Sequence, residues 1–302
     1  MPLVTIESEH WRVSIAPDAG ASLTACEIQL AGRWVPLMRP TPPAAVAQGN
    51  SSQMASFLLA PWSNRIRDAR FPFNGRLIQL RPNTPEGYAH HGDVRKRPWQ
   101  AARAAERSAL FLFDSRHFAD INFPFPFTCS IEYRLDGPAF ASVLTLTNTG
   151  TESMPAGLGF HPYFQRALTA GEDVQLQFSA RGVYRDLVPS ESAGPLGAGQ
   201  DFSRGRTLGA QAFDHCFAGW DGRARLRWPQ SGVTVQVECN EPLGHLILYA
   251  PPAQPYFALE PVSHATNGFN LLPAGVPDTG VQILEPGQSI AASLHLVWRP
   301  AG

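Results

Sequence analysis

The sequence predicts an all-β protein, either a β-sandwich or a related barrel, with few short helices. Apolar and polar residues alternate with a period of two in many short segments, which is the pattern of a half-buried strand. The 26 Gly and 28 Pro residues are spread along the 302 residues and leave little room for long helices. Many short strands separated by turn residues are typical of sandwiches and barrels.

The expected strands follow one another from the N-terminus. Trp11–Ile15 alternates within a stretch that also contains acidic residues, which predicts a strand and not a secretory leader. Later segments with the same alternation are Val143–Thr147, Val174–Phe178, Val233–Val237 and Leu246–Tyr249. The clearest pattern covers 290–298, where apolar side chains take every second position: Ile290, Ala292, Leu294, Leu296 and Trp298.

The segment "QAARAAERSALFLF" (100–113) favours a helix by propensity alone, because it is rich in Ala and Arg. Its second part, Leu110–Phe113, is an apolar run of strand length. We therefore expect a strand, a turn at "RAAERS" (103–108) and a second strand, with tertiary packing overriding propensity. The Pro- and Gly-rich stretches 36–50 and 189–209 predict long surface loops. Neither indicates a domain boundary, so residues 1–302 are expected to form a single domain.

Composition excludes several classes of protein. Hydrophobic residues make up 44 % and charged residues 16 %, which indicates a globular chain. The formal net charge of −1 argues against nucleic acids and membrane surfaces as partners. No apolar run approaches the roughly 20 residues needed to cross a bilayer. The four cysteines, widely spaced and without a CxxC pair, predict buried thiols in the reducing cytoplasm.

Two ionisable residues stand directly before prolines, His161 in "GFHPYF" and Glu260 in "YFALEP". A following proline restricts the backbone to an extended form and removes one N–H donor. We therefore expect each side chain to project from a strand end with a fixed direction. Together they could act as a general acid and base. The alternative for His161 is a satisfied core histidine, whereas a carboxylate such as Glu260 is rarely buried without a partner.

Three further residues are candidates for binding a ligand: Arg65, His91 and Asp214. Each also has an ordinary structural interpretation. Arg65 could pair with Asp68 on the surface, Asp214 could be a turn residue, and His91 could lie at a loop tip. His90 and His264 receive no role. No two histidines share a strand at ligand spacing, so no metal is expected.

In chain order, five stretches together resemble the aldose 1-epimerase (galactose mutarotase) family. They are "NRI" (64–66), "HHGD" (90–93), "GFHPYF" (159–164), "FDHCF" (213–217) and "LEPVSHATNGFN" (259–270). The resemblance implies a large antiparallel β-sandwich with a carbohydrate cleft on its concave face. It also implies an isomerase that interconverts the α and β anomers of a hexose or related aldose, without metal or organic cofactor.

By motif position, the resemblance implies that Glu260 is the general base and His161 the general acid. Arg65, His91 and Asp214 would bind the sugar. The chain departs from the family where Asp93 replaces a second glycine after His-Gly. "HPYF" also replaces the His-Ser/Thr-Tyr-Phe form, which leaves a branch with another substrate open. Stacking of the sugar on Trp62, Phe217 or Trp220 is a weaker expectation, because aromatic residues are usually core.

Two alternatives stay open at this point. A hexose-6-phosphate mutarotase would use arginines for the phosphate, and the candidates are Arg67, Arg70, Arg95 and Arg97. A sugar-binding or sensing module of the same fold would need no acid and base, which the His161 and Glu260 motifs argue against. The residues favour no particular oligomeric state.

Overall fold

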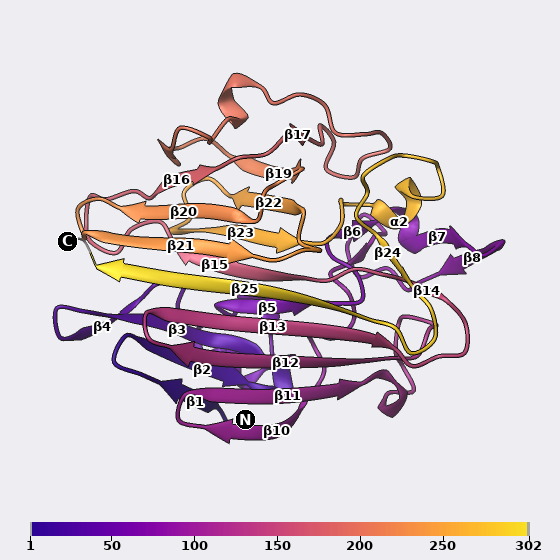
Figure 1. Ribbon diagram of the computed structural model, residues 1–302, viewed down its shortest axis with the longest axis horizontal. Helices are drawn as coiled ribbons and strands as arrows, with labels where there is room; N and C mark the ends of the chain where they lie inside the picture. The colour runs from indigo at the N-terminus through magenta and orange to yellow at the C-terminus, as the bar shows by residue number, and fades with distance from the viewer. Residues whose placement is uncertain (1, 301–302) are drawn as a thin grey trace.

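The computed structural model of the protein describes residues 2–300 and contains two large antiparallel sheets packed face to face (Figure 1). Every strand pairing within the described residues is antiparallel. The core between the sheets includes Val13, Leu58 and Leu259 from one sheet and Leu144 and Leu296 from the other. The fold is therefore the large antiparallel β-sandwich that the family resemblance implies, and not the barrel that the strand pattern also allowed.

The larger sheet has ten strands. Their order is β1 (Val4–Glu7), β2 (Trp11–Ala16), β3 (Ser22–Leu30), β5 (Ser56–Leu59), β15 (Gly159–Gln165), β23 (Tyr256–Val262), β22 (His245–Ala250), β19 (Phe213–Ala218) and β17 (Gly182–Val183), with β4 (Arg33–Pro36) paired to β3. This sheet carries most of the candidate site residues, as described below.

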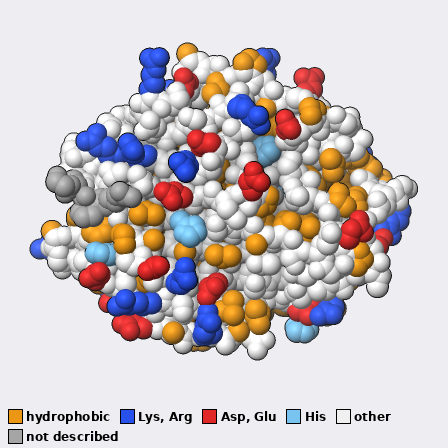
Figure 2. Space-filling model, in the orientation of Figure 1, with side chains coloured by type: hydrophobic (Ala, Val, Ile, Leu, Met, Phe, Trp, Pro, Cys, Tyr) orange, Lys and Arg blue, Asp and Glu red, His pale blue; other side chains and the backbone are white. Residues whose placement is uncertain are grey.

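The second sheet has nine strands. Their order is β10 (Gln100–Ala105), β11 (Ser108–Asp114), β12 (Phe127–Asp136), β13 (Ala139–Asn148), β25 (Ser289–Pro300), β21 (Val233–Cys239), β20 (Arg223–Trp228), β16 (Gln175–Phe178) and β18 (Arg206–Thr207). Its outer face, seen in Figure 2, carries interspersed blue and red side chains. That view gives no sign of a basic stripe of the kind that nucleic acids require.

Shorter elements close the ends of the sandwich. The two-stranded pairs are β6 (Arg65–Ile66) with β9 (Ala89–His90), β7 (Arg70–Phe73) with β8 (Arg76–Gln79), and β14 (Met154–Ala156) with β24 (Gln282–Leu284). The helical segments are α1 (Pro43–Ala47), α2 (Gly268–Leu271) and the 3₁₀ turns η1 (Pro17–Ala19), η2 (Ser51–Gln53), η3 (Arg67–Ala69), η4 (Ser115–His117) and η5 (Ala198–Gln200). Neither α-helix in the described part of the chain is long and apolar enough to span a bilayer.

The strand predictions are confirmed, with small corrections at the loops. Along β25 the side chains of Ala292, Leu294, Leu296 and Trp298 are buried, as the alternation predicts. Segment 100–113 forms the hairpin of β10 and β11, but its turn is only residues 106–107 and is shorter than expected. The segments 36–50 and 189–209 are mostly irregular, yet they contain α1, η5 and β18.

The central strands of the larger sheet are buried on both faces. In β23, Phe257 and Leu259 point into the core between the sheets. Ala258 and Val262 instead belong to a second apolar cluster on the sheet's other face. The side chains of β23 thus alternate between the two faces of the sheet. Because Glu260 shares a face with Ala258 and Val262, it points away from the sandwich core.

Candidate active site

The floor of the site consists of two cross-strand rows on the face of the larger sheet that lies away from the core. In the first row, ladder pairs join Phe57 of β5 to His161 of β15, and Glu260 of β23 to Ile247 of β22. The second row contains Tyr163, Ala258, Tyr249 and Asp214, each paired with the next across β15, β23, β22 and β19. Residues far apart in sequence thus meet on one surface.

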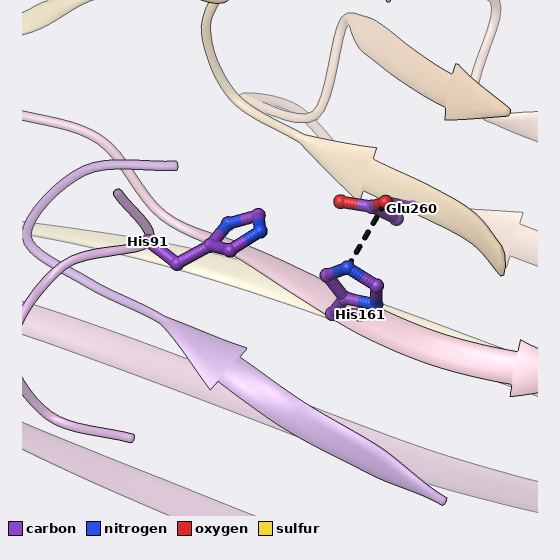
Figure 3. Close-up of side chains that lie close together, drawn as sticks. All are labelled: His91, His161 and Glu260. Atoms are coloured by element: carbon purple, nitrogen blue, oxygen red, sulfur yellow. Dashed lines mark ion pairs between the residues drawn. The ribbon is translucent and has the colours of Figure 1, made fainter. Parts of the chain in front are cut away.

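His161 and Glu260 face each other across β15 and β23, and their atoms Nε2 and Oε1 are 3.1 Å apart (Figure 3). The register joins Gly159 to Val262 and Tyr163 to Ala258, which places His161 opposite Glu260. Opposed side chains in an antiparallel pair are within direct reach. The strand pairing therefore creates the contact between these two residues.

The expectation that His161 and Glu260 lie at strand ends is wrong. Both β15 and β23 continue past the prolines, to Gln165 and Val262. No ladder pair joins Phe160–Pro162 to Leu259–Pro261, because proline has no N–H to donate. The prolines interrupt the ladder between the two strands locally, and each strand stays paired to its outer neighbour.

Burial shifts the proton affinity of both groups in opposite directions. His161 is 4 % exposed and Glu260 is 2 % exposed. Desolvation lowers the pKa of His161 well below its ordinary value, and the positive charges of Arg39 and Arg95 add to this effect. Desolvation raises the pKa of Glu260 well above its ordinary value, assisted by Asp214 and opposed by Arg65. Both shifts oppose the charged forms, so burial favours a protonated carboxyl on Glu260 and a neutral imidazole on His161.

Two atoms of this pair have no hydrogen-bond partner among the described residues, namely Nδ1 of His161 and Oε2 of Glu260. Both atoms are buried. Unpartnered buried polar atoms are uncommon in folded proteins and are frequent where a ligand supplies the missing partner. Nδ1 of His161 and Oε2 of Glu260 are therefore free to form hydrogen bonds with a polar ligand.

One wall of the site is a loop that carries His91 into the pocket. The backbone N–H of His91 donates to the carbonyl of Asn64 (2.9 Å). In return, the backbone N–H of Asn64 donates to Nδ1 of His91 (3.2 Å). Burial lowers the pKa of His91 well below its ordinary value, so the ring is neutral and carries its proton on Nε2. His91 therefore offers one N–H donor.

The backbone of this loop is held in an uncommon conformation. Both Asn64 (φ 51°) and His91 (φ 63°) adopt left-handed conformations. Gly92 (φ 66°) cannot be replaced without movement, since a Cβ there would lie 1.9 Å from the carbonyl oxygen of Ala60. Asp93, the departure from the family pattern, pairs with Arg97 (3.1 Å) and accepts from the backbone of the neighbouring loop. Strain of this kind is typical of functional sites.

Arg65 of β6 and Asp214 of β19 approach each other at the pocket. Their atoms Nη2 and Oδ2 are 3.8 Å apart, and Nη1 of Arg65 donates to Oδ1 of Asn64 (2.8 Å). Asp68 pairs with Arg70, with 3.4 Å between Oδ2 and Nη2, and does not pair with Arg65. Burial raises the pKa of Asp214, and the charge of Arg65 opposes this rise. Arg65 and Asp214 thus present a donor fork and an acceptor to the same space.

The two unassigned histidines have different surroundings. The ring of His90 stacks on His91, with centroids 3.6 Å apart, and lines the pocket. Burial and the charge of Arg65 lower its pKa to about 2. His264 is a structural residue, because its Nδ1 bonds the carbonyl of Ala265 (2.7 Å) and its Nε2 accepts from the backbone of Ser63 (3.0 Å).

These residues surround a pocket of about 200 Å³. The lining residues are Asn64, Arg65, His90, His91, His161, Tyr163, Asp214, Tyr249 and Glu260. All five predicted site residues are among them. Asn64, His90, Tyr163 and Tyr249 also line the pocket and were not among the predicted site residues. For Tyr163 the signal was present, since it shares the strand face of His161 in "HPYF".

The aromatic residues proposed to stack on a sugar are not in the pocket. Trp62 (0 % exposed), Phe217 (0 %) and Trp220 (4 %) all belong to the core between the sheets. In β19, Phe217 points inward because Asp214 and Cys216 occupy the outward positions. The aromatic side chains at the pocket are instead Tyr163 and Tyr249.

Three of the pocket side chains also form a set that could bind a metal. His91, His161 and Glu260 each place one ligand atom within 4.8 Å of the other two. Two imidazoles and a carboxylate suit zinc and other transition metals. The nearby charges of Arg65 and Arg95, which lower the pKa of His91, oppose the binding of a cation at the same place.

Comparison with known proteins agrees with this architecture. The chain is 31 % identical over 310 residues to the uncharacterized protein YphB of Escherichia coli K12, with 98 % of each chain covered. It is 27 % identical over 167 residues to the aldose 1-epimerase of the same organism. This aligned stretch covers 54 % of this chain and 47 % of that enzyme. A galactose mutarotase-like protein from Clostridium acetobutylicum has the same fold, with a TM-score of 0.85, 17 % identity and 98 % and 94 % of the two chains covered. The profile of the family described as aldose 1-epimerase matches residues 2–296, and the chain belongs to this family.

Proposed function

We propose that the protein is an aldose 1-epimerase, which interconverts the α and β anomers of an aldose by opening and closing its ring. The contact of 3.1 Å between His161 and Glu260 is the observation that carries the proposal. It provides one proton donor and one proton acceptor in a pocket with further polar groups. A hexose ring has its C1 hydroxyl and its ring oxygen on adjacent positions, as such a pair requires.

The reaction needs two proton transfers, and the pair supplies both. Glu260, as carboxylate, takes the proton of the C1 hydroxyl, and His161, as imidazolium, gives a proton to the ring oxygen. The C1–O5 bond breaks, the aldehyde forms, and rotation about C1–C2 exposes its other face. Closure reverses both transfers. Burial disfavours both charged forms, so the pair reaches the carboxylate and imidazolium state when the carboxyl proton of Glu260 passes to Nε2 of His161 across their contact of 3.1 Å.

The remaining residues hold the sugar. The Nε2–H of neutral His91 would donate to an oxygen near the reacting bond. Arg65 and Asp214, 3.8 Å apart, would bind neighbouring hydroxyls as donor and acceptor. Tyr163 and Tyr249 offer ring surface or hydroxyl groups to the sugar. Substrate binding thus fixes the anomeric carbon above the pair.

Polarimetry on freshly dissolved α-anomers tests the proposal. The protein is expected to accelerate the approach to anomeric equilibrium of glucose, galactose or a derivative above the spontaneous rate. A coupled assay with a dehydrogenase specific for one anomer gives an independent readout. A protein that binds these sugars and leaves every rate at the background value would instead be a sugar-binding module.

The pH dependence of kcat/KM is expected to show a broad plateau around neutrality. The active pair holds one proton, so activity is lost when the pair gains a second proton or loses its only one. Burial moves the gain of the second proton well below the ordinary pKa of His. It moves the loss of the only proton well above the ordinary pKa of Glu. Background-corrected rates across this range test it, and a loss of half the activity near pH 6.5 would contradict it.

Removal of metal ions is expected to leave the rate unchanged. The proton transfers need only the side chains of His161 and Glu260, and neighbouring arginines disfavour a cation there. Rates before and after dialysis against a chelator measure this, with the total metal content determined on the same sample. Loss of activity that returns on adding zinc would show that the set of His91, His161 and Glu260 works as a metal site.

A further inference from the structure

Two arginines beside the pocket have no acidic partner. Among the described residues, no carboxylate lies within 4.0 Å of a guanidinium nitrogen of Arg39 or Arg95, whereas Arg65 has Asp214. Arg95 is only 7 % exposed. Burial lowers its pKa to about 10, which still leaves it charged at neutral pH. A buried charge without a counter-ion is costly and calls for a functional explanation.

Both guanidinium groups converge on Ser52 in η2. Nη1 of Arg95 donates to the hydroxyl of Ser52 (2.5 Å), and Nη2 of Arg39 donates to the carbonyl of the same residue (2.6 Å). Arg39 also bonds the carbonyl of Met54 through Nε (3.1 Å) and Nη2 (2.8 Å). Two positive charges are therefore held near one point by neutral oxygen acceptors.

Each arginine is one aromatic ring away from the candidate acid. The Cζ of Arg39 lies 3.5 Å from the ring centre of Tyr163, whose ring is 4.5 Å from that of His161. The Cζ of Arg95 lies 5.1 Å from the ring centre of Phe57, which stacks on His161 at 4.3 Å. Both charges act on the imidazole and lower its pKa.

The backbone that carries Arg95 is closely packed. A Cβ on Gly20 (φ 74°) would lie 2.3 Å from the carbonyl oxygen of Arg95, so only glycine allows this approach. The N–H of Gly20 donates to the carbonyl of Arg97 (2.8 Å). Arg95 is therefore positioned in advance and need not be ordered by a ligand.

The other arginines considered for phosphate binding are occupied elsewhere. Arg70 pairs with Asp68, and Arg97 pairs with both Asp93 and Asp120. The guanidinium of Arg67 donates to the backbone carbonyl of Val188. Arg67 also lacks an acidic partner among the described residues, but Arg39 and Arg95 differ from it because both donate to Ser52 and lie against the rings of Tyr163 and Phe57 that flank His161.

We propose that the physiological substrate is an aldose with an oxyanion group on C6, a phosphate or a carboxylate, which binds to Arg39 and Arg95. This inference rests on the proposed function. In a pyranose, C6 is attached to C5, the carbon bonded to the ring oxygen. A side chain that protonates the ring oxygen therefore lies close to the C6 substituent. His161 in that role places the anionic group toward the two arginines beside it.

The wild-type protein provides the first test. Background-corrected anomerisation rates, measured by NMR exchange, are compared for glucose, glucose 6-phosphate and glucuronate. The value of kcat/KM is expected to be at least about tenfold higher for one of the anionic sugars, and to fall as salt is added. The preferred sugar distinguishes phosphate from carboxylate. Inorganic phosphate is expected to inhibit competitively if the phosphate is preferred.

Charge-removing variants locate the effect. Arg95→Gln and Arg39→Gln are expected to raise KM about tenfold or more for the anionic sugar and to change KM for glucose little. Loss of a charged hydrogen bond has this size. The matched control is Arg103→Gln, which removes an exposed arginine paired with Glu132 on the second sheet (2.5 Å). Its kinetic constants are expected to stay unchanged.

The outcomes separate this inference from the function on which it rests. If kcat/KM for glucose equals or exceeds the values for both anionic sugars, the proposed C6 oxyanion is wrong. The proposed epimerase activity would still stand. If Arg95→Gln lowers kcat/KM for glucose and for the anionic sugar by the same factor, Arg95 has a structural role only. Background rates for every sugar would overturn the inference together with the proposed function.

Discussion

Replacing Glu260 with Gln is expected to lower kcat for anomer interconversion by about 10²–10⁴-fold, the usual contribution of a general base. Gln has nearly the same shape and can still bond Nε2 of His161, now 3.1 Å from Oε1. It cannot accept a proton. Polarimetry on the purified variant gives the rate, and its KM is expected to change much less than kcat because the amide oxygen can still accept a hydrogen bond from the C1 hydroxyl.

The fold of this variant is expected to persist. Burial raises the pKa of Glu260, so replacing the carboxyl with a neutral amide removes a group that the interior disfavours when charged. Glu172→Gln is the control, because that buried carboxylate accepts from Ser231 and Gln230 far from the pocket. It is expected to lower the thermal midpoint and leave kcat unchanged. Full activity of Glu260→Gln would refute the assignment of the base.

Replacing His161 with Gln is expected to reduce kcat by about 10²-fold or more, because the ring oxygen loses its proton donor. The smaller side chain also loses the stacking on Phe57, whose ring centre is 4.3 Å from the imidazole. The acid limb of the pH profile is expected to disappear with the imidazole. Rates and pH profiles measured above the spontaneous background check both effects.

The two replacements are expected not to add. Residues that act as one proton-transfer unit lose most of their contribution when either is removed. The double variant should therefore be about as slow as Glu260→Gln alone. His117→Gln, a change at an exposed residue of η4, serves as the control and should retain wild-type kinetics. Additive losses in the double variant would indicate that the two residues act independently.

Much of the fold could be predicted from local patterns. Alternation identified β2, β13, β21 and β25, because side chains on a strand point to opposite faces. The hairpin of β10 and β11 could be predicted although its composition favours a helix, since the apolar run of β11 has strand length and its Phe111 and Phe113 are buried. The order in which the strands pair depends on contacts between distant segments, so it could not be predicted from local patterns.

The site was predictable only in part, for the same reason. The prolines after His161 and Glu260 marked unusual backbone, but their meaning depended on the register of β15 against β23. Viewed separately, each dipeptide indicates a strand end. His90 and Tyr249 have no local signal, because a loop and a cross-strand neighbour bring them to the pocket. Motif resemblance, and not periodicity, assigned Arg65.

The interrupted ladder between β15 and β23 divides the larger sheet into two halves at its middle. The half ending in β15 carries His161 and the half beginning with β23 carries Glu260, each tied to its own neighbours. Between the flanking pairs Gly159–Val262 and Tyr163–Ala258, no backbone ladder holds the two strands together. Breathing there would lengthen the Nε2–Oε1 contact and admit the C1–O5 bond of a sugar between the two proton carriers.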